Sequence, residues 1–205
     1  MRKLHPLIAT FAVVACTAIA QAQTGTSTPG TGAGTSPDTG ANAGASGNSM
    51  AQSTLSETER NFMRDAAQAG HAELQASQLA LTRATDPAVK EFAQQVIDDH
   101  TQANAQLQQI AQAKGMTLPT EASSMHRSKL KSLESKEGSR FDHQYIEDFG
   151  IQAHRRTVEQ FRKEAQNGQD TDVKSFAQQT LPALEKHLQH AMSMQGNRNK
   201  RGSTS

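Results

Sequence analysis

Apolar residues recur every three or four positions in four long segments of the chain, a period that predicts amphipathic α-helices. The segments span residues 56–84, 86–115, 139–168 and 170–195. A Ser-x-x-Glu capping box opens the first segment and Asp-Pro opens the second, whereas a glycine ends the second and the third. The pattern therefore predicts an all-α protein with four long helices.

A short repeat relates the second and fourth segments. The sequence VKEFAQQ at residues 89–95 returns as VKSFAQQ at residues 173–179, and an acidic residue suited to a helix N-cap precedes each copy, Asp86 and Asp170 respectively. A repeat of this kind indicates that one helical hairpin has been used twice. Two such hairpins packed face to face predict a four-helix bundle.

The connector between the two hairpins, residues 116–138, is long enough to contain structure of its own. Pro119 interrupts the chain near its start, and three later apolar residues predict a short extra helix: Met125, Leu130 and Leu133. A connector of this length can run back along the bundle as a crossover, or it can fold over one end. The sequence leaves both paths open.

One polar residue interrupts the apolar stripe of each long helix. Counted from the expected hairpin turns at Thr85 and Gln169, all four fall near mid-height: Glu73, His100, His154 and His187. Burying an unpaired carboxylate or imidazole costs roughly several kcal/mol unless a hydrogen-bond partner or a metal ion satisfies it. Three imidazoles and a carboxylate are suitable ligands for zinc, iron or copper.

Two interpretations of this set remain open from the residues alone. The four side chains bind a transition-metal ion, or they form a buried hydrogen-bonded network that is purely structural. We expect the remaining histidines to be peripheral. The candidates for orienting the inner rings are Asp99, Asp142, Tyr145 and Glu185.

The N-terminal region has the features of a secretory signal peptide at residues 1–22. A short positive start precedes an apolar run at residues 7–20, and Ala20-Gln21-Ala22 offers a small-x-small cleavage site. The run is shorter than the roughly 20 residues that a membrane span needs. We therefore expect a periplasmic or otherwise exported protein without a transmembrane segment in the mature chain. The alternative is a lipid anchor at Cys16, the single cysteine.

Composition divides the rest of the chain into three parts. Residues 23–54 are rich in Gly, Ser, Thr and Ala and predict a disordered spacer, and residues 55–195 predict the bundle domain. Residues 196–205 predict a disordered basic tail. The net charge of +1 argues against a nucleic-acid partner. Protein partners are not indicated.

Several short patterns together resemble a family of exported bacterial proteins, domain of unknown function 4142. The patterns are FxxxAAxxGxxE (62–73), VKxFA (89–93), DH (99–100), FDxxY (141–145) and FAxxxLPxLxxH (176–187), with His154 between the last two. The resemblance covers nearly the whole expected domain. It implies a ferritin-like helical bundle and export, and it implies no particular activity.

The ligand pattern of ferritin-like di-iron proteins is not matched. Those proteins carry Glu-x-x-His pairs, whereas the residues three positions before the inner histidines are Ile97, Ile151 and Leu184. A di-iron centre is therefore not expected, and a mononuclear site rich in imidazole is. Nucleophile motifs and phosphate-binding glycine loops are also missing from the sequence, which favours a non-enzymatic protein. The alternative function is a structural or stress-response interaction protein of the cell envelope.

Overall fold

The structure is a computed structural model that describes residues 55–202, with side chains up to residue 198. The predicted signal peptide, the spacer and Cys16 lie outside the described residues. The final helix continues to Gly202, beyond residue 195 where we expected the bundle to end.

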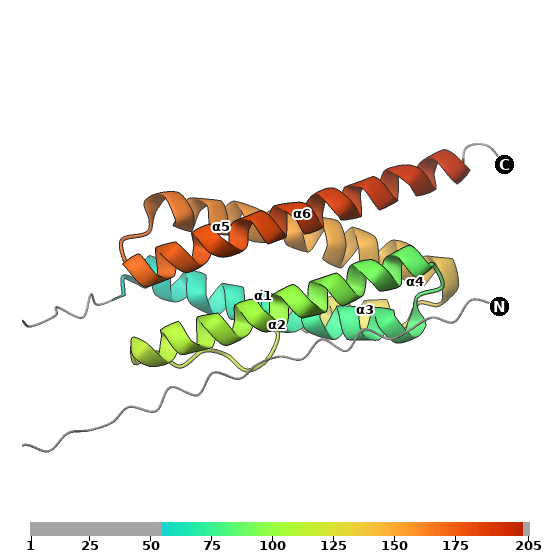
Figure 1. The fold of residues 1–205 in the computed structure, drawn as a ribbon. Helices are drawn as coiled ribbons and strands as arrows, with labels where there is room; N and C mark the ends of the chain where they lie inside the picture. The colour runs from blue at the N-terminus through green and yellow to red at the C-terminus, as the bar shows by residue number, and fades with distance from the viewer. Residues whose placement is uncertain (1–54, 203–205) are drawn as a thin grey trace, which may run out of the picture. The chain divides into compact units, whose positions relative to one another are not determined.

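The described part of the chain contains helices and no strands, and its long helices form two hairpins (Figure 1). Helices α1 (Glu57–Arg83) and α2 (Pro87–Ala113) make the first hairpin. In the second hairpin, one arm consists of α4 (Gly138–Tyr145), the π-helical segment η1 (Ile146–Ala153) and α5 (His154–Asn167), and the other is α6 (Thr171–Gly202). The four-helix bundle predicted from the repeat is confirmed.

The connector between the hairpins crosses the length of the bundle. The end of α2 lies beside the start of α6, because Lys114 Nζ is 2.8 Å from the Asp170 carboxylate. The start of α4 lies at the opposite end, because Asp142 accepts hydrogen bonds from the turn between α1 and α2. The predicted short helix is present as α3 (Ser124–Glu134), packed against α1. Of the two paths left open by the sequence, the crossover is therefore correct.

Each hairpin turn is held by a buried carboxylate from the other hairpin. Glu59 on α1 accepts from the backbone N–H groups of Gln169 and Asp170, at 2.8 and 2.6 Å. Asp142 on α4 accepts from the backbone N–H groups of Thr85 and Asp86, both at 3.0 Å. These donors belong to turns and helix starts, which have no partner within their own helix. The two carboxylates therefore join the hairpins at both ends of the bundle.

The apolar core consists of two clusters, one toward each end of the bundle. The first contains Phe92, Phe141 and Leu133, and the second contains Phe62, Leu107 and Phe176, with smaller residues filling each. Along every long helix the four polar residues predicted from the sequence lie near the boundary between these clusters. We call Glu73, His100, His154 and His187 the polar layer.

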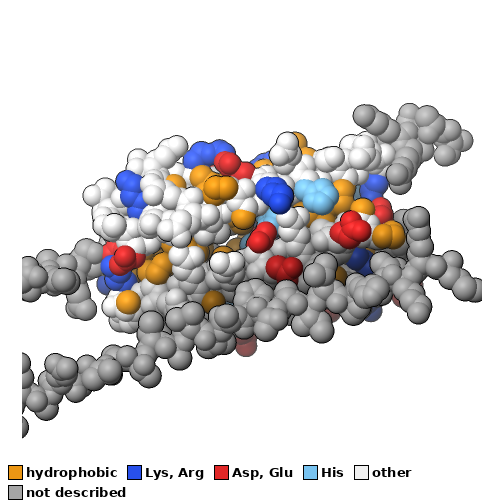
Figure 2. All heavy atoms as spheres, in the orientation of Figure 1, with side chains coloured by type: hydrophobic (Ala, Val, Ile, Leu, Met, Phe, Trp, Pro, Cys, Tyr) orange, Lys and Arg blue, Asp and Glu red, His pale blue; other side chains and the backbone are white. Residues whose placement is uncertain are grey.

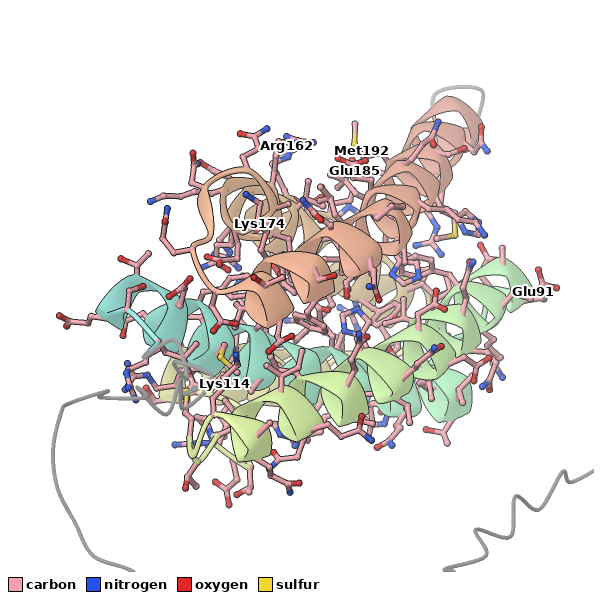
Figure 3. All side chains as sticks on the ribbon, turned by 60° about the vertical axis from the view of Figure 1, so that its left-hand side comes forward. Glu91, Lys114, Arg162, Lys174, Glu185 and Met192 are labelled. Carbon is pink, nitrogen blue, oxygen red and sulfur yellow. The ribbon has the colours of Figure 1, made fainter. Side chains whose placement is uncertain are left out.

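The surface of the bundle carries mixed charges. On the face seen in Figure 2, acidic and basic side chains are interspersed among uncharged ones. Figure 3 shows Arg162 and Glu185 on the outside of α5 and α6, where they form an ion pair. None of the helices between residues 55 and 202 is long and apolar enough to cross a membrane.

Candidate metal centre

The polar layer consists of one side chain from each of the four long helical arms of the bundle. The exposed fractions are 1% for Glu73 on α1, 6% for His100 on α2, 1% for His154 on α5 and 0% for His187 on α6. The imidazole rings lie against one another, with centroids 5.1 to 5.8 Å apart. The structure thus brings the four predicted residues together in one buried layer.

The π-helical segment η1 orients His154. Its Nδ1 is 2.8 Å from the carbonyl oxygen of Phe149, five residues earlier, while its backbone N–H donates to Ile151. A π-helix widens the turn, so that the Phe149 carbonyl can accept a hydrogen bond from the imidazole N–H. In a neutral ring, a proton on Nδ1 leaves a lone pair on Nε2. That lone pair points into the polar layer.

Asp99 orients His187 in the same way from the other side. The Nε2 of His187 is 2.8 Å from Asp99 Oδ2, so that it carries the donated proton and Nδ1 carries the lone pair. This Nδ1 lies only 3.2 Å from the Nε2 of His154. Two nitrogen lone pairs that face each other repel, unless a proton or a metal ion lies between them.

Glu73 and His100 complete the layer without an oriented hydrogen bond. His100 Nε2 is 2.9 Å from Glu73 Oε2, yet in the described part of the chain neither that nitrogen nor either carboxylate oxygen has a partner at hydrogen-bonding angles. At these angles the short separation adds little hydrogen bonding, because hydrogen bonds weaken steeply away from linear geometry. The other Glu73 oxygen, Oε1, lies 3.9 Å from His154 Nδ1, the nitrogen that faces the Phe149 carbonyl.

Burial and mutual proximity set the protonation of the layer. Burial, together with the neighbouring rings of His154 and His100, lowers the pKa of His187 to about 4, against the raising effect of Asp99. Burial also lowers the pKa of His154, against the opposing effect of Glu73. Burial alone would raise the pKa of Glu73, but the imidazoles of His154 and His100 lower it to about 2. Near neutral pH, His154 and His187 are thus neutral and Glu73 is a carboxylate, the forms that bind metal.

The spacing of the ring nitrogens is close to that of a coordination site. One nitrogen from each of the three histidines lies within 4.8 Å of the others. Two nitrogens bound tetrahedrally to one zinc ion at about 2.05 Å are about 3.3 Å apart, close to the contact between His154 and His187. The distance between two ligand atoms of one zinc ion cannot exceed about 4.2 Å. The most distant of the three nitrogens would therefore have to move inward to bind the same ion.

Comparison with known protein families agrees with this architecture. The profile of domain of unknown function 4142 (DUF4142) matches residues 44–194. The chain belongs to the DUF4142 family. The resemblance inferred from the sequence patterns is therefore confirmed. No curated protein matches this DUF4142 chain.

Three solved structures share the fold of this DUF4142 protein. A DUF305 fragment from Deinococcus radiodurans has a TM-score of 0.62 at 14% identity, over 70% of this chain and 98% of that one. A DUF305 protein from Streptomyces coelicolor, described as a predicted secreted protein, has a TM-score of 0.59 at 15% identity, over 69% and 94%. A conserved hypothetical protein from Mycobacterium tuberculosis has a TM-score of 0.54 at 14% identity, over 68% and 91%. At such identities the likeness concerns the fold.

Of the four candidates for orienting the rings of this DUF4142 protein, only Asp99 is bonded to one. Asp142 caps the turn at one end of the bundle, Tyr145 pairs with Ser77 at 2.8 Å, and Glu185 pairs with Arg162 on the surface. Sequence reasoning missed the contribution of the Phe149 carbonyl. The signal for it was the change of apolar flank between Phe149 and Ile151, which marks the extra residue of a π-helix.

Proposed function

We propose that this protein binds one transition-metal ion in the polar layer, through His100, His154, His187 and Glu73. The observation that supports it most directly is that His154 Nε2 and His187 Nδ1 are 3.2 Å apart and each carries a lone pair. The other nitrogen of each ring already donates to a protein oxygen. An ion there would satisfy these nitrogens, His100 Nε2 and the Glu73 carboxylate together.

The donor set suits zinc, copper(II) or iron(II), which accept imidazole and carboxylate ligands. The residues line one small site without a second set of bridging carboxylates, and a mononuclear site is therefore the expectation. Bound ion would stabilise the fold, because the unfolded chain does not hold the four ligands together. The role would be to sequester or sense the metal.

The proposal includes export of the protein. The signal-peptide pattern at residues 1–22 supports it, as does the predicted secreted protein from Streptomyces coelicolor with the same fold. Mass spectrometry of the protein from the cell envelope should find Gln23 at the N-terminus. Loss of membrane association in Cys16→Ser, with Cys16 acylated in the native protein, would instead establish the lipid-anchored form.

Metal binding is tested on tag-free, chelator-treated protein. We expect one equivalent of zinc, copper(II) or iron(II) to raise the Tm, and the double variant His154→Ala/His187→Ala to abolish both the shift and the bound metal. The matched control is His71→Ala/His143→Ala, which removes two histidines outside the layer and should leave binding unchanged. If no ion raises the Tm, and if protein taken directly from its compartment contains no stoichiometric metal, the proposal is wrong.

The second candidate function is a structural or stress-response protein of the envelope, in which the layer is a Glu–His network. The 2.9 Å separation of His100 and Glu73 favours it, because a small side-chain rotation would make a hydrogen bond there. Under this alternative, metal has no effect on Tm, and the change Glu73→Gln strongly destabilises the protein because it breaks a buried pair.

A further inference from the structure

Asp99 connects the buried polar layer to the protein surface. Its side chain is 42% exposed, whereas the His187 ring that it holds is completely buried. One nitrogen of that ring faces Asp99 and the other faces the centre of the layer. The Asp99–His187 pair thus spans the distance from solvent to the site.

A groove between α2 and α6 leads to Asp99. It has a volume of about 270 Å³, and the residues along it are small or uncharged apart from Asp99 itself; they include Gln102, Gln106, Gln179, Thr180 and Ala183. The helices are joined across it by a hydrogen bond of 3.3 Å from Gln106 Nε2 to Gln179 Oε1. The neighbouring Pro182 has no backbone N–H to donate within α6. Amide oxygens and one carboxylate are hard oxygen ligands, which replace the water around a cation stepwise.

The hollow on the opposite side of the bundle is less suited to a cation. It has a volume of about 180 Å³ between α1, α3 and α5, and Arg156 and His126 line it together with Ala69 and Asp65. The guanidinium of Arg156 is always protonated and repels an approaching cation. Of these two hollows, the one with Asp99 therefore suits a cation better, because its lining has a carboxylate and no Lys or Arg.

Resting on the metal-binding function proposed above, we infer that a hydrated divalent cation reaches the polar layer through the α2–α6 groove and that Asp99 is its first protein ligand. The ion exchanges water for the Asp99 carboxylate in the groove, then for the imidazoles inside. Once the ion is bound, Asp99 again accepts the His187 N–H. Glu73 and Asp99 then supply the two negative charges that neutralise a divalent ion in the low-dielectric interior.

The test measures the rate at which Co²⁺ enters the chelator-treated full chain, followed by visible absorption in a stopped-flow instrument. Asp99→Asn retains the shape and an acceptor for His187 but removes the charge. The matched control, Asp98→Asn, removes the same charge from the adjacent exposed residue, which accepts a hydrogen bond from Gln94. We expect Asp99→Asn to slow association by about tenfold at low salt, and Asp98→Asn to change it less than about twofold.

A second pair of variants tests the path without changing charge. Ala183→Leu narrows the α2–α6 groove, and Ala69→Leu narrows the opposite hollow. We expect only Ala183→Leu to slow association, with the final absorption unchanged.

The outcomes separate this inference from the function on which it rests. If the unaltered protein binds none of Co²⁺, zinc, copper(II) and iron(II), both are wrong. If it binds metal, but Asp99→Asn associates as fast as Asp98→Asn and only dissociates faster, Asp99 positions His187 and is not the route. Slower association in Ala69→Leu than in Ala183→Leu would likewise overturn the route.

Discussion

The buried carboxylates at the two ends of the bundle and the one at its middle have opposite surroundings. Glu59 and Asp142 are buried, and each receives backbone N–H groups from the turn of the other hairpin. Glu73 is just as buried, yet within residues 55–202 neither of its oxygens has an oriented donor. Stability of the bundle is enough to explain the buried carboxylates at the ends, because their donors and acceptors match.

The middle of the bundle needs a different explanation. There, acceptors face acceptors. Two imidazole nitrogens that each carry a lone pair, His154 Nε2 and His187 Nδ1, are 3.2 Å apart, and the Glu73 carboxylate lies 2.9 Å from His100 Nε2. A purely structural network would be expected to match its donors and acceptors as the ends do. The buried polar groups at the ends therefore join the hairpins, whereas those in the middle leave unsatisfied ligand atoms, which supports the metal site proposed above.

The largest effect on stability should come from the end carboxylates. In Asp142→Asn, one of the two carboxylate oxygens that accept hydrogen bonds from Thr85 and Asp86 becomes an NH₂ group. The substitution also removes the negative charge. We expect the free energy of unfolding to fall by about 3 kcal/mol, measured by urea denaturation. Metal affinity should remain unchanged, and a parallel loss of affinity would show that the two regions are not independent.

In the metal-free protein, acid should begin to destabilise the middle of the bundle at a higher pH than the ends. The pKa of His187 falls from 6.5 to about 4 on folding, so the unfolded chain takes up the proton first and stability is lost as the pH falls from 6.5 to 4. The pKa of Glu59 is lowered from 4.5 against the effect of burial, mainly by the Asp170 amide, so its stabilisation is lost only below that value. The urea midpoint should therefore already fall between pH 6.5 and 4.5.

The variant His187→Gln identifies the group responsible. It should reduce this dependence between pH 6.5 and 4.5, with the part due to His154 remaining, and leave the loss at lower pH in place. An unchanged slope would mean that His187 does not titrate in that window.

The scaffold of the layer is sensitive to shape as well as to polarity. A Cβ added at Gly150 in η1 would lie 2.9 Å from the Ala191 Cβ of α6 and 3.4 Å from the ring of Phe92. We expect Gly150→Ala to lower the free energy of unfolding by about 2 kcal/mol. Gly196→Ala is the control, because an added Cβ there meets no atom within 4 Å. Equal stability of the two variants would show that the close approach is not required.

The smallest effect on stability is expected for Glu73→Gln in the metal-free protein. The amide retains the shape of the side chain, and the carboxylate that it replaces has no oriented donor to lose. We expect a change below about 1 kcal/mol, together with a loss of metal affinity of at least about tenfold. A destabilisation as large as that of Asp142→Asn would favour the structural network and erase the contrast between the two regions.

The sequence alone determined the bundle and the level of the polar layer. The repeated segment at residues 89–95 and 173–179, with its acidic N-caps, predicted two related hairpins, and helical periodicity placed Glu73, His100, His154 and His187 on inward stripes. These features are readable because helix formation and amphipathicity are local properties of a segment. The short connector helix followed from the same rule.

Only the tertiary structure decided the path of the connector and the partners of the polar groups. That Asp99 holds a ring while Asp142 and Glu185 do not depends on where separate helices meet, and side-chain spacing within one helix does not contain that information. The π-helical segment that aims His154 was likewise decided by packing. A widened turn costs local hydrogen-bond geometry, and the fit of Gly150 against α6 and the bond from His154 to Phe149 offset that cost.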